Sequence, residues 1–334
     1  MIKKTMALTA LLAAAAGASA QSSVTVFGVI DANVGWGKGS LTSLKRLGNS
    51  GFLGSRLGFR GTEDLGGGLK VNFVIETGIN NDDGTSASPT VFWNRLSYLG
   101  LSGDWGELQL GRNYTPTFLV HATYDAFGPQ GVAAQQVLFG SMEVSQPANI
   151  RANDSVNYNS PKLGGLVTVQ AMVTDRSTPN DYRGIRANLS TGGLSADLAV
   201  GHFGNPTIGD LKSLTIGARY VTGPFKLYGL HDRANSGTGS DSKGTQVSMG
   251  YVMGATELKA SIARSDLTSA AGADIGTTRR IGLGFTHAMS KRSFLYGQVA
   301  QLSNSNGARM TVNGATTAAN ESAKGFDLGL AHTF

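Results

Sequence analysis

The chain has 334 residues, of which 47 are Gly, 15% are charged and none is Cys. An ordinary globular protein has about 7% Gly and about 25% charged residues, so this composition is unusual for a soluble protein. The Gly residues follow no three-residue period, which excludes collagen, and the scattered aromatic and aliphatic side chains argue against a disordered chain. The lack of Cys excludes disulfide scaffolds, Cys-ligated zinc and thiol nucleophiles.

Residues 1–20 have the pattern of a cleaved secretory signal peptide. Lys3 and Lys4 form a basic start, residues 6–16 form an apolar segment, and the small residues 18–20 form a cleavage site. A membrane-anchoring helix needs about 20 apolar residues, and this segment is shorter. We therefore expect the signal peptide to be removed.

The expected mature domain, residues 21–334, loses Lys3 and Lys4 from the 28 basic residues, which leaves 26 against 22 acidic residues and a formal charge of +4. This excess is too small to indicate a nucleic-acid-binding protein. No run in the domain approaches 18 apolar residues, and the mean hydropathy is −0.07, so no transmembrane helix is predicted. The remaining classes are a secreted or periplasmic β-protein and a membrane β-barrel, whose strands alternate between lipid-facing and water-facing side chains.

Apolar and polar side chains alternate along the chain with a period of two. In residues 24–36, Val26 and Ile30 share one face and Asp31 lies on the other. Such alternation predicts β-strands with one apolar and one polar face. The same pattern recurs in residues 69–76, 213–220, 280–286 and 326–334.

Short turns and long loops alternate between the expected strands. The turns fall near residues 66–68, 103–105, 162–165, 192–193, 223–224, 253–255 and 289–292. The loops fall near residues 38–53, 79–91, 114–152, 176–182, 204–211, 234–243, 266–276 and 303–322. Seven turns and eight loops predict one all-β domain of sixteen strands, with fourteen or eighteen as alternatives. An outer-membrane antiparallel barrel has short turns at one end and long loops at the other, and its closure leaves no edge strand in lipid.

Several local motifs resemble the trimeric Gram-negative general porins, in particular the betaproteobacterial branch that includes anion-selective members. The motifs are QSSVTVFG at 21–28, RLGFRGTEDLGGGLK at 56–70, LGLSGDWG at 99–106, LGRNY at 110–114, MSKR at 289–292 and the terminal Phe334. The resemblance covers essentially the whole mature chain. It implies a sixteen-stranded barrel in the outer membrane, a homotrimer packed through the first strands, and a third loop, here residues 114–152, folded into the lumen. It also implies that Phe334 is a C-terminal signal for the barrel assembly machinery.

The resemblance further implies a basic cluster on the barrel wall facing the inserted loop, at Arg56, Arg95 and Arg151. Alternation independently places Arg56 on the polar face. In the alternation, Arg95 falls on the same face as the apolar Leu99 and Leu101. A bulge or a strand start near residue 95 is therefore needed to turn its side chain toward the lumen. Guanidinium groups stay charged and bind carboxylate, phosphate or chloride. In a water-filled constriction, salt screens their repulsion while their common field attracts anions.

The inserted loop offers few acids to oppose this cluster. The family's loop usually has a Pro-Glu-Phe-Gly type of stretch, whereas this loop reads YDAFGPQG at 124–131 and has only Asp125 and Glu143. This departure favours anion preference. The two-residue alternation places five further basic residues on the face toward the lumen, and they could extend the basic surface: Arg60, Lys70, Arg186, Arg219 and Lys226.

Arg112 has two interpretations. It is either another lumen cation or, as in similar porins, a trimer latch that pairs with an acid on the second loop of a neighbouring subunit. Glu76, Asp82 and Asp83 are the candidate partners.

Three other functions compete with a general porin. An outer-membrane enzyme needs a His beside a nucleophile or acids, but the five His residues lie in unrelated segments without metal-ligand spacing. We therefore expect no catalytic residues, metal or cofactor. A non-conducting structural or adhesive barrel should lack the inserted loop and the basic cluster. A substrate-specific channel for a sugar or an organic anion stays open, because Tyr114, Phe118, Tyr124 and Phe127 could form an aromatic track.

The prediction is a porin for passive diffusion of small hydrophilic solutes and ions, with anion preference. Its expected surroundings are outer-membrane lipid and lipopolysaccharide.

Overall fold

The computed structural model describes residues 23–135, 150–175, 181–204 and 209–334. The predicted signal peptide therefore lies outside the described residues. The described chain forms antiparallel strands and one short helix, α2 (Pro116–Thr123). The strands are β1 (Ser23–Lys38), β2 (Ser43–Asn49), β3 (Arg56–Gly66), β4 (Leu69–Asn80), β5 (Thr85–Ser86), β6 (Leu96–Gly103), β7 (Gly106–Tyr114), β8 (Arg151–Asn159), β9 (Val167–Thr174), β10 (Tyr182–Thr191), β11 (Leu194–Phe203), β12 (Leu211–Thr222), β13 (Phe225–Ser236), β14 (Asp241–Met253), β15 (Thr256–Thr268), β16 (Asp274–Ala288), β17 (Ser293–Ser305) and β18 (Ala323–Thr333).

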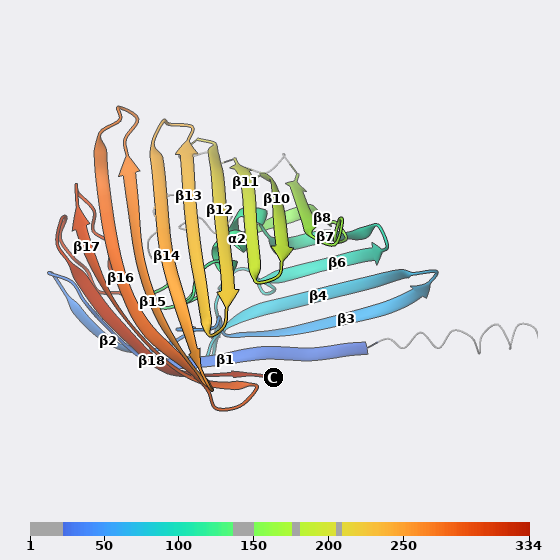
Figure 1. Ribbon diagram of the computed structural model, residues 1–334, viewed down its shortest axis with the longest axis horizontal. Helices are drawn as coiled ribbons and strands as arrows, with labels where there is room; N and C mark the ends of the chain where they lie inside the picture. The colour runs from blue at the N-terminus through green and yellow to red at the C-terminus, as the bar shows by residue number, and fades with distance from the viewer. Residues whose placement is uncertain (1–22, 136–149, 176–180, 205–208) are drawn as a thin grey trace, which may run out of the picture.

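The strands form one closed antiparallel barrel (Figure 1). Neighbouring strands pair in chain order, apart from two interruptions described below, and β18 returns to pair with β1, with Lys324 opposite Lys38 and Thr333 opposite Val29. This last pairing leaves no open edge, which in a membrane would expose unpaired backbone groups to lipid.

Eighteen strand segments occupy sixteen positions around the barrel. β1 pairs with β2 along one half and with β3 along the other, so β2 and β3 are one position interrupted at residues 50–55. β5 and β6 likewise both pair with β4. The predicted count of sixteen is therefore confirmed.

The connections differ at the two ends of the barrel. All seven predicted turns join consecutive strands at one end, here called the turn end, and the longer connections lie at the other, the loop end. The turn between β3 and β4 needs three consecutive residues with positive φ, at Gly66 (81°), Gly67 (61°) and Gly68 (83°). Glycine adopts this backbone conformation without the steric cost that a Cβ atom brings.

The two faces of the wall differ as the alternation predicts. In β1, the outward Val26, Ile30 and Val34 are exposed, whereas the inward Asp31 and Asn33 are 0% and 2% exposed. The exposed apolar face suits lipid, and the polar face lines the interior.

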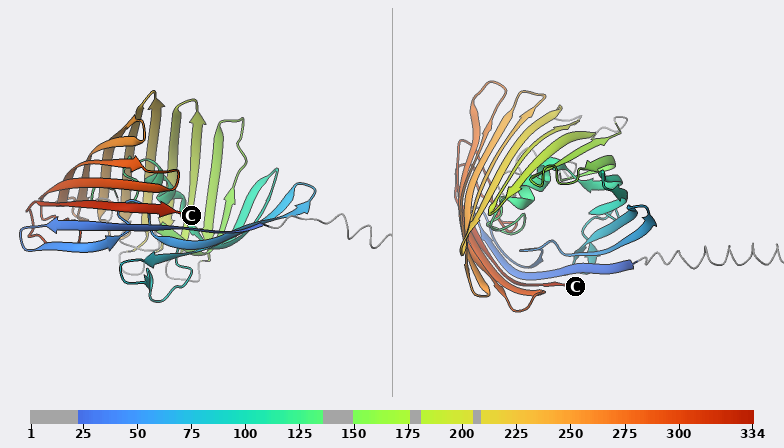
Figure 2. Two further views of the ribbon diagram at one scale, coloured as in Figure 1. Left: turned by 90° about the horizontal axis from the view of Figure 1, so that it is seen from below. Right: turned by 45° about the vertical axis from the view of Figure 1, so that its right-hand side comes forward.

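The chain after β7 folds into the barrel (Figure 2). It begins with α2, whose cap Thr115 accepts a hydrogen bond from the Phe118 amide at 3.3 Å. Pro116 is the first helical residue, where its missing N–H costs nothing. Among the described residues, no helix is long and apolar enough to cross a membrane.

The apolar core lies between this inserted loop and the wall. Val120 and Tyr124 pack against Ala199, Leu230 and Ala263 on the strands. Further along the chain, a second cluster consists of Ala126, Phe127, Val132, Ala133, Ala300, Leu302, Val312 and Ala323. The loop is thus held by packing against the wall, and the predicted insertion of residues 114–152 is seen for the described part, up to residue 135.

Candidate functional site

The three predicted arginines lie where strands start on the side of the loop end. Arg56 is the first residue of β3, Arg95 directly precedes β6, and Arg151 is the first residue of β8. The strand start that the parity of Arg95 requires is therefore present. Because β2 occupies the loop-end half of the same barrel position, Arg56 lies part-way down the wall, within reach of Glu76, which also pairs with Arg95.

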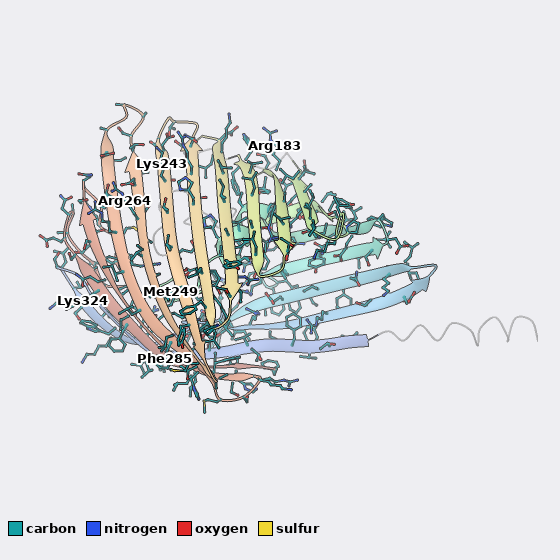
Figure 3. The ribbon with its side chains drawn as sticks, in the orientation of Figure 1. Arg183, Lys243, Met249, Arg264, Phe285 and Lys324 are labelled. Carbon is teal, nitrogen blue, oxygen red and sulfur yellow. The ribbon has the colours of Figure 1, made fainter. Side chains whose placement is uncertain are left out.

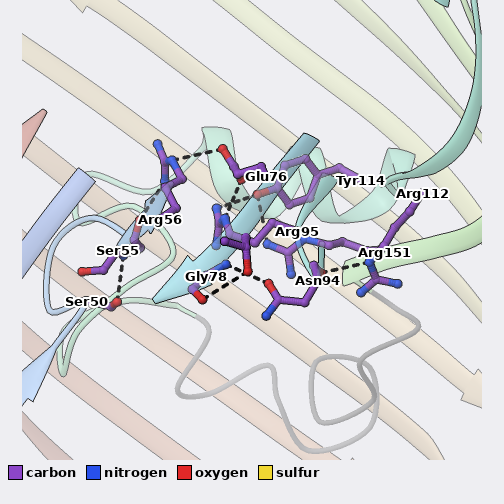
Figure 4. A network of polar contacts seen from close by, with 12 residues as sticks. Ser50, Ser55, Arg56, Glu76, Gly78, Asn94, Arg95, Arg112, Tyr114 and Arg151 are labelled. Carbon is purple, nitrogen blue, oxygen red and sulfur yellow. Dashed lines mark hydrogen bonds and ion pairs between the residues drawn. The ribbon is translucent and has the colours of Figure 1, made fainter. Parts of the chain in front are cut away.

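Two acceptors join these arginines into one network (Figure 4). The Tyr114 hydroxyl accepts hydrogen bonds from Arg95 Nη2 at 2.8 Å and from Arg151 Nη2 at 3.0 Å. The carboxylate of Glu76 accepts from Arg95 Nε at 2.5 Å and lies 3.3 Å from Arg56 Nε. The structure therefore brings together all three predicted basic residues.

The cluster carries more positive than negative charge. Glu76 is the only carboxylate that the structure pairs with the three guanidinium groups, within the described residues, which leaves an excess of two positive charges. The guanidinium carbon of Arg151 also lies 4.6 Å from the centre of the Tyr114 ring, a cation–π contact that orients it. The side chains of Arg56 and Arg95 keep 27% and 16% exposure, so their charge reaches the water of the lumen.

Glu76 occupies a different place from the one expected for a trimer latch. Both of its carboxylate oxygens face Arg56 and Arg95 of the same chain, and the residue is 4% exposed. It is therefore not available to Arg112 of a neighbouring subunit. Its parity in β4 could have revealed this, because Glu76 lies directly opposite Gly58 on the inward face that also carries Arg56.

Arg112 lies beside the cluster and has partners in its own chain. Its Nε donates to the Asn94 carbonyl at 2.9 Å, and its Nη1 donates to Asn153 Oδ1. The remaining candidate latch acids, Asp82 and Asp83, are exposed in the connection after β4.

Asp125 holds the inserted loop together, in contrast to the expectation that it faces the channel. Its carboxylate accepts hydrogen bonds from the Phe127 amide at 3.0 Å and the Gln135 amide at 2.8 Å. Burial raises the pKa of Asp125, while the positive charge of Arg280 and these hydrogen bonds act in the opposite direction. The second expected loop acid, Glu143, lies outside the described residues.

The five additional cations do not form one continuous basic track. Arg186 Nη2 lies 2.6 Å from Asp197, and Lys226 Nζ lies 3.0 Å from Glu257, so both charges are neutralised. The other three are Arg60, which stacks on Phe27 at 5.1 Å, the exposed Lys70 and the half-buried Arg219.

Two inward cations were missed as site residues. Arg280 is 1% exposed and donates to Gln246 Oε1 at 2.6 Å and to the carbonyl of Ala134 in the loop. Lys259 Nζ lies 5.0 Å from the centre of the Phe52 ring. Alternation places Arg280 on the polar face of its strand, but only the folded loop shows that it binds loop backbone.

A closed barrel with an apolar exterior, a polar interior and excess positive charge on the wall beside an inserted loop defines an outer-membrane channel. Within the described residues, no cluster of His, Asp and Glu is arranged to hold a metal ion. The chain belongs to the Gram-negative porin family, whose model matches residues 7–307. It is therefore a porin of the Gram-negative outer membrane.

Known porins are similar to this chain along most or all of its length. Outer membrane porin protein 32 of Delftia acidovorans is 34% identical, and the match covers 100% of both chains. An outer membrane porin protein of Bordetella pertussis is 32% identical over 70% of this chain and 60% of its own. The solved structure of an anion-selective porin from Comamonas acidovorans has a TM-score of 0.84 and 30% identity, covering 94% of this chain and 100% of that protein. A trimer form of OmpT of Vibrio cholerae shares the fold, with a TM-score of 0.70 at 15% identity over 94% of this chain and 99% of that protein.

Proposed function

We propose that this porin lets small hydrophilic solutes and ions diffuse passively and that it prefers anions. The observation that carries the proposal is the cluster of Arg56, Arg95 and Arg151, in which Glu76 is the only carboxylate paired with these arginines among the described residues. A ring of charged side chains selects ions of the opposite sign. The 30% identical porin from Comamonas acidovorans is described as anion-selective, which agrees with this sign.

The inserted loop adds little negative charge in the described part. Asp125 is 5% exposed and hydrogen-bonded within the loop, so it does not offset the arginines from across the lumen. The aromatic residues that a sugar channel would use are also occupied. Phe118, Tyr124 and Phe127 are buried in loop packing, and the Tyr114 hydroxyl binds two arginines. These contacts favour ions and general solutes over sugars, and we assign the chain no catalytic role.

Reversal potentials across planar bilayers under a KCl gradient test the proposal. The purified wild-type protein should give the sign of an anion-selective channel. The combined change of Arg56, Arg95 and Arg151 to Ser, together with Glu76→Gln so that no carboxylate is left unpaired, should reduce the anion preference. Arg183→Ser on the outer face is the matched control and should leave it unchanged.

A cation-selective wild type would overturn the anion preference, and a wild type without conductance would overturn the channel itself. An unchanged permeability ratio in the arginine variant would show that these residues are not the filter.

We also propose that residues 1–20 are removed and that the mature chain, residues 21–334, assembles as a homotrimer. Phe334 would be the C-terminal signal that the barrel assembly machinery recognises.

Within this trimer, Arg112 would pair with Asp82 or Asp83 of a neighbouring subunit. Two hydrogen bonds from Thr85 lower the pKa of Asp83, so this carboxylate stays charged and suits a latch.

A further inference from the structure

A polar pocket lies on the inner side of the wall, where the inserted loop meets the first and last strands. Its volume is about 470 Å³, which is in the range of sites for small organic molecules. Segments far apart in the sequence line it, with Arg46 from β2, Gln130 from the inserted loop, Asn313 from the connection between β17 and β18, and Asp327 from β18. None of these residues belongs to the arginine cluster.

Two opposite charges stand in one row across the sheet at this pocket. Gly35 of β1 is directly opposite Asp327 on one side and directly opposite Arg46 on the other. Neighbouring strands are about 4.8 Å apart, so the backbones of Asp327 and Arg46 are about 10 Å apart. Gly35 has no side chain to fill the space between them. A Cβ atom there would lie 3.0 Å from both Asp327 Oδ1 and Asn313 Nδ2.

The pocket is open to the channel and not to the membrane. Lys243 and Arg264 are exposed on the outer face of the wall (Figure 3). Arg46 is also exposed, but its partner Gly35 shares the inward face of β1 with the buried Asp31. Solutes in the channel can therefore reach the Arg46 guanidinium.

Asn313 keeps the two charges of the pocket from forming a direct ion pair. Its Oδ1 accepts a hydrogen bond from Arg46 Nη2 at 2.9 Å, and its Nδ2 donates to Asp327 Oδ1 at 2.8 Å. Elsewhere on the inner wall, opposite charges contact each other directly, as Arg186 Nη2 does with Asp197 at 2.6 Å. The cation and the anion of the pocket are thus spaced by one carboxamide group.

Both charged groups can take further partners. Asp327 is 2% exposed, and its two oxygens accept one hydrogen bond each, from Asn313 and from the Val132 amide at 3.0 Å. A carboxylate oxygen can accept more than one hydrogen bond. Within the described part of the chain, the bond to Asn313 is the only hydrogen bond of the Arg46 side chain, so its other N–H donors are free for a ligand.

A buried amide without a partner lies beside the pocket. Asn33 precedes Gly35 on the inward face of β1 and is 2% exposed. Neither its Oδ1 nor its Nδ2 has a hydrogen-bond partner among the described residues. A Cβ atom at Gly51, which lines the pocket, would lie 2.7 Å from this Nδ2. Because buried amides normally have partners, this corner of the channel suits a polar solute with its water.

We propose that this pocket binds free α-amino acids in their zwitterionic form. The carboxylate accepts hydrogen bonds from the free donors of Arg46, since guanidinium groups match carboxylates with two parallel bonds. The ammonium group donates to Asp327. In an α-amino acid a single carbon joins the two charged groups, which suits charges that one carboxamide, that of Asn313, already spans.

A solute with a single charge would leave either Arg46 or Asp327 without a charged partner. The inference concerns a binding site outside the arginine cluster. It does not depend on the ion selectivity of the pore.

Saturation-transfer difference NMR on the purified full assembly in detergent tests the proposal. The probes are L-alanine, β-alanine, whose charged groups are one carbon further apart, and propionate, which has no ammonium group. Titrations give the dissociation constants. The variants are Arg46→Gln and Asp327→Asn. Lys45→Gln is the matched control, because the exposed Lys45 precedes Arg46 in β2 and lies on the outer face.

The wild-type protein should bind L-alanine more tightly than β-alanine or propionate. Arg46→Gln and Asp327→Asn should each bind L-alanine at least about tenfold more weakly, because each removes a charged hydrogen-bond partner. Lys45→Gln should bind like wild type. Asp327→Asn keeps an oxygen that can accept from the Val132 amide, so the contact with the inserted loop can persist.

Equal wild-type affinity for L-alanine and propionate would overturn the proposal and indicate a site for anions only. Equal affinity for β-alanine would overturn the assignment to α-amino acids, and unchanged L-alanine binding by Arg46→Gln would overturn the site itself. Conductance is measured on the same samples. A conducting variant shows that the barrel has folded, and a non-conducting wild type would refute the pore function without bearing on amino-acid binding. Arg46→Gln changes an exposed side chain, so it decides the outcome even if Asp327→Asn does not fold.

Discussion

At the scale of single residues, the charge of the pore is decided by which acids reach the arginines. Glu76 accepts a hydrogen bond from Arg95 and pairs with Arg56 inside the cluster, and the carboxylate of Asp125 accepts hydrogen bonds from loop amides. Asp197 and Glu257 neutralise cations elsewhere on the wall. The count of charges is therefore less informative than their pairing, because a paired cation contributes little field to the lumen.

The change Glu76→Gln should increase the anion preference. It removes the carboxylate between Arg56 and Arg95 while keeping an acceptor oxygen in place. The shift in reversal potential should be larger in 0.1 M than in 1 M KCl, because the Debye length falls from about 10 Å to about 3 Å. Glu63→Gln, on the exposed part of β3 near the turn end, is the control and should have a much smaller effect. A shift toward cations in the Glu76 variant would contradict the assignment.

At the scale of elements, the inserted loop is seated by close backbone contact with the wall. Gly131 has a φ of +87°, and a Cβ atom there would lie 1.7 Å from Gln298 Nε2 and 2.3 Å from the Gly51 carbonyl oxygen. The Gln298 side chain donates to the same Gly51 carbonyl at 2.6 Å and accepts from the Ala133 amide at 3.2 Å. The loop, the interruption between β2 and β3, and β17 are therefore locked together at this point.

The change Gly131→Ala should loosen the loop and cost about 3 kcal/mol, since it combines overpacking with a strained backbone. Gly128→Ala is the matched control, because Gly128 also has a positive φ of +70° but nothing within 4 Å of the added Cβ. The control should cost only about 1 kcal/mol of backbone strain. Heat unfolding in detergent and single-channel current noise measure the two effects. Equal loss of stability in both variants would show that contact with the wall is unimportant.

At the scale of the whole molecule, the outer wall has two kinds of surface. Four exposed basic residues, Arg233, Lys243, Arg264 and Arg279, lie on the outward face of β13 to β16, whereas the first strands carry the surface through which related porins are expected to pack. A trimer would then leave these four residues in contact with lipid, whereas Lys38 on β1 lies beside the packing surface.

The latch predicts how the trimer responds to substitution and to pH. Asp83→Asn or Asp82→Asn, whichever residue pairs with Arg112, should lower the temperature at which trimers dissociate in detergent gels, without unfolding the monomer. Asp104→Asn at the turn end is the control. Because hydrogen bonds from Thr85 lower the pKa of Asp83, an Asp83 latch should persist as the pH falls through about 4 and weaken only below it. Unchanged dissociation in both variants would rule out these latch partners.

The fold could be predicted in detail, and the site only in part. Alternation and turn chemistry indicated all seven turns and the sixteen positions, because both depend on neighbouring residues. The basic cluster came from the resemblance together with the parity of Arg56. Glu76 was one of three candidate partners for the latch, because its actual partners depend on the register between β3, β4 and β6. Asp125 was placed at the channel because loop amides and Arg280 meet it only after the loop has folded.

The local chemistry of the chain determines a barrel with an apolar exterior, a polar interior, short turns and long loops. The period of two determines on which face of the wall each side chain lies, and Gly and other small residues determine where the chain turns. Neither property says which side chain stands beside another on that face. Strand register and the inserted loop determine which side chains are neighbours. They place Glu76 between Arg56 and Arg95, and they place Arg264 opposite Arg279 on the outer wall. The tertiary structure therefore determines where the excess positive charge of the mature chain is free to act.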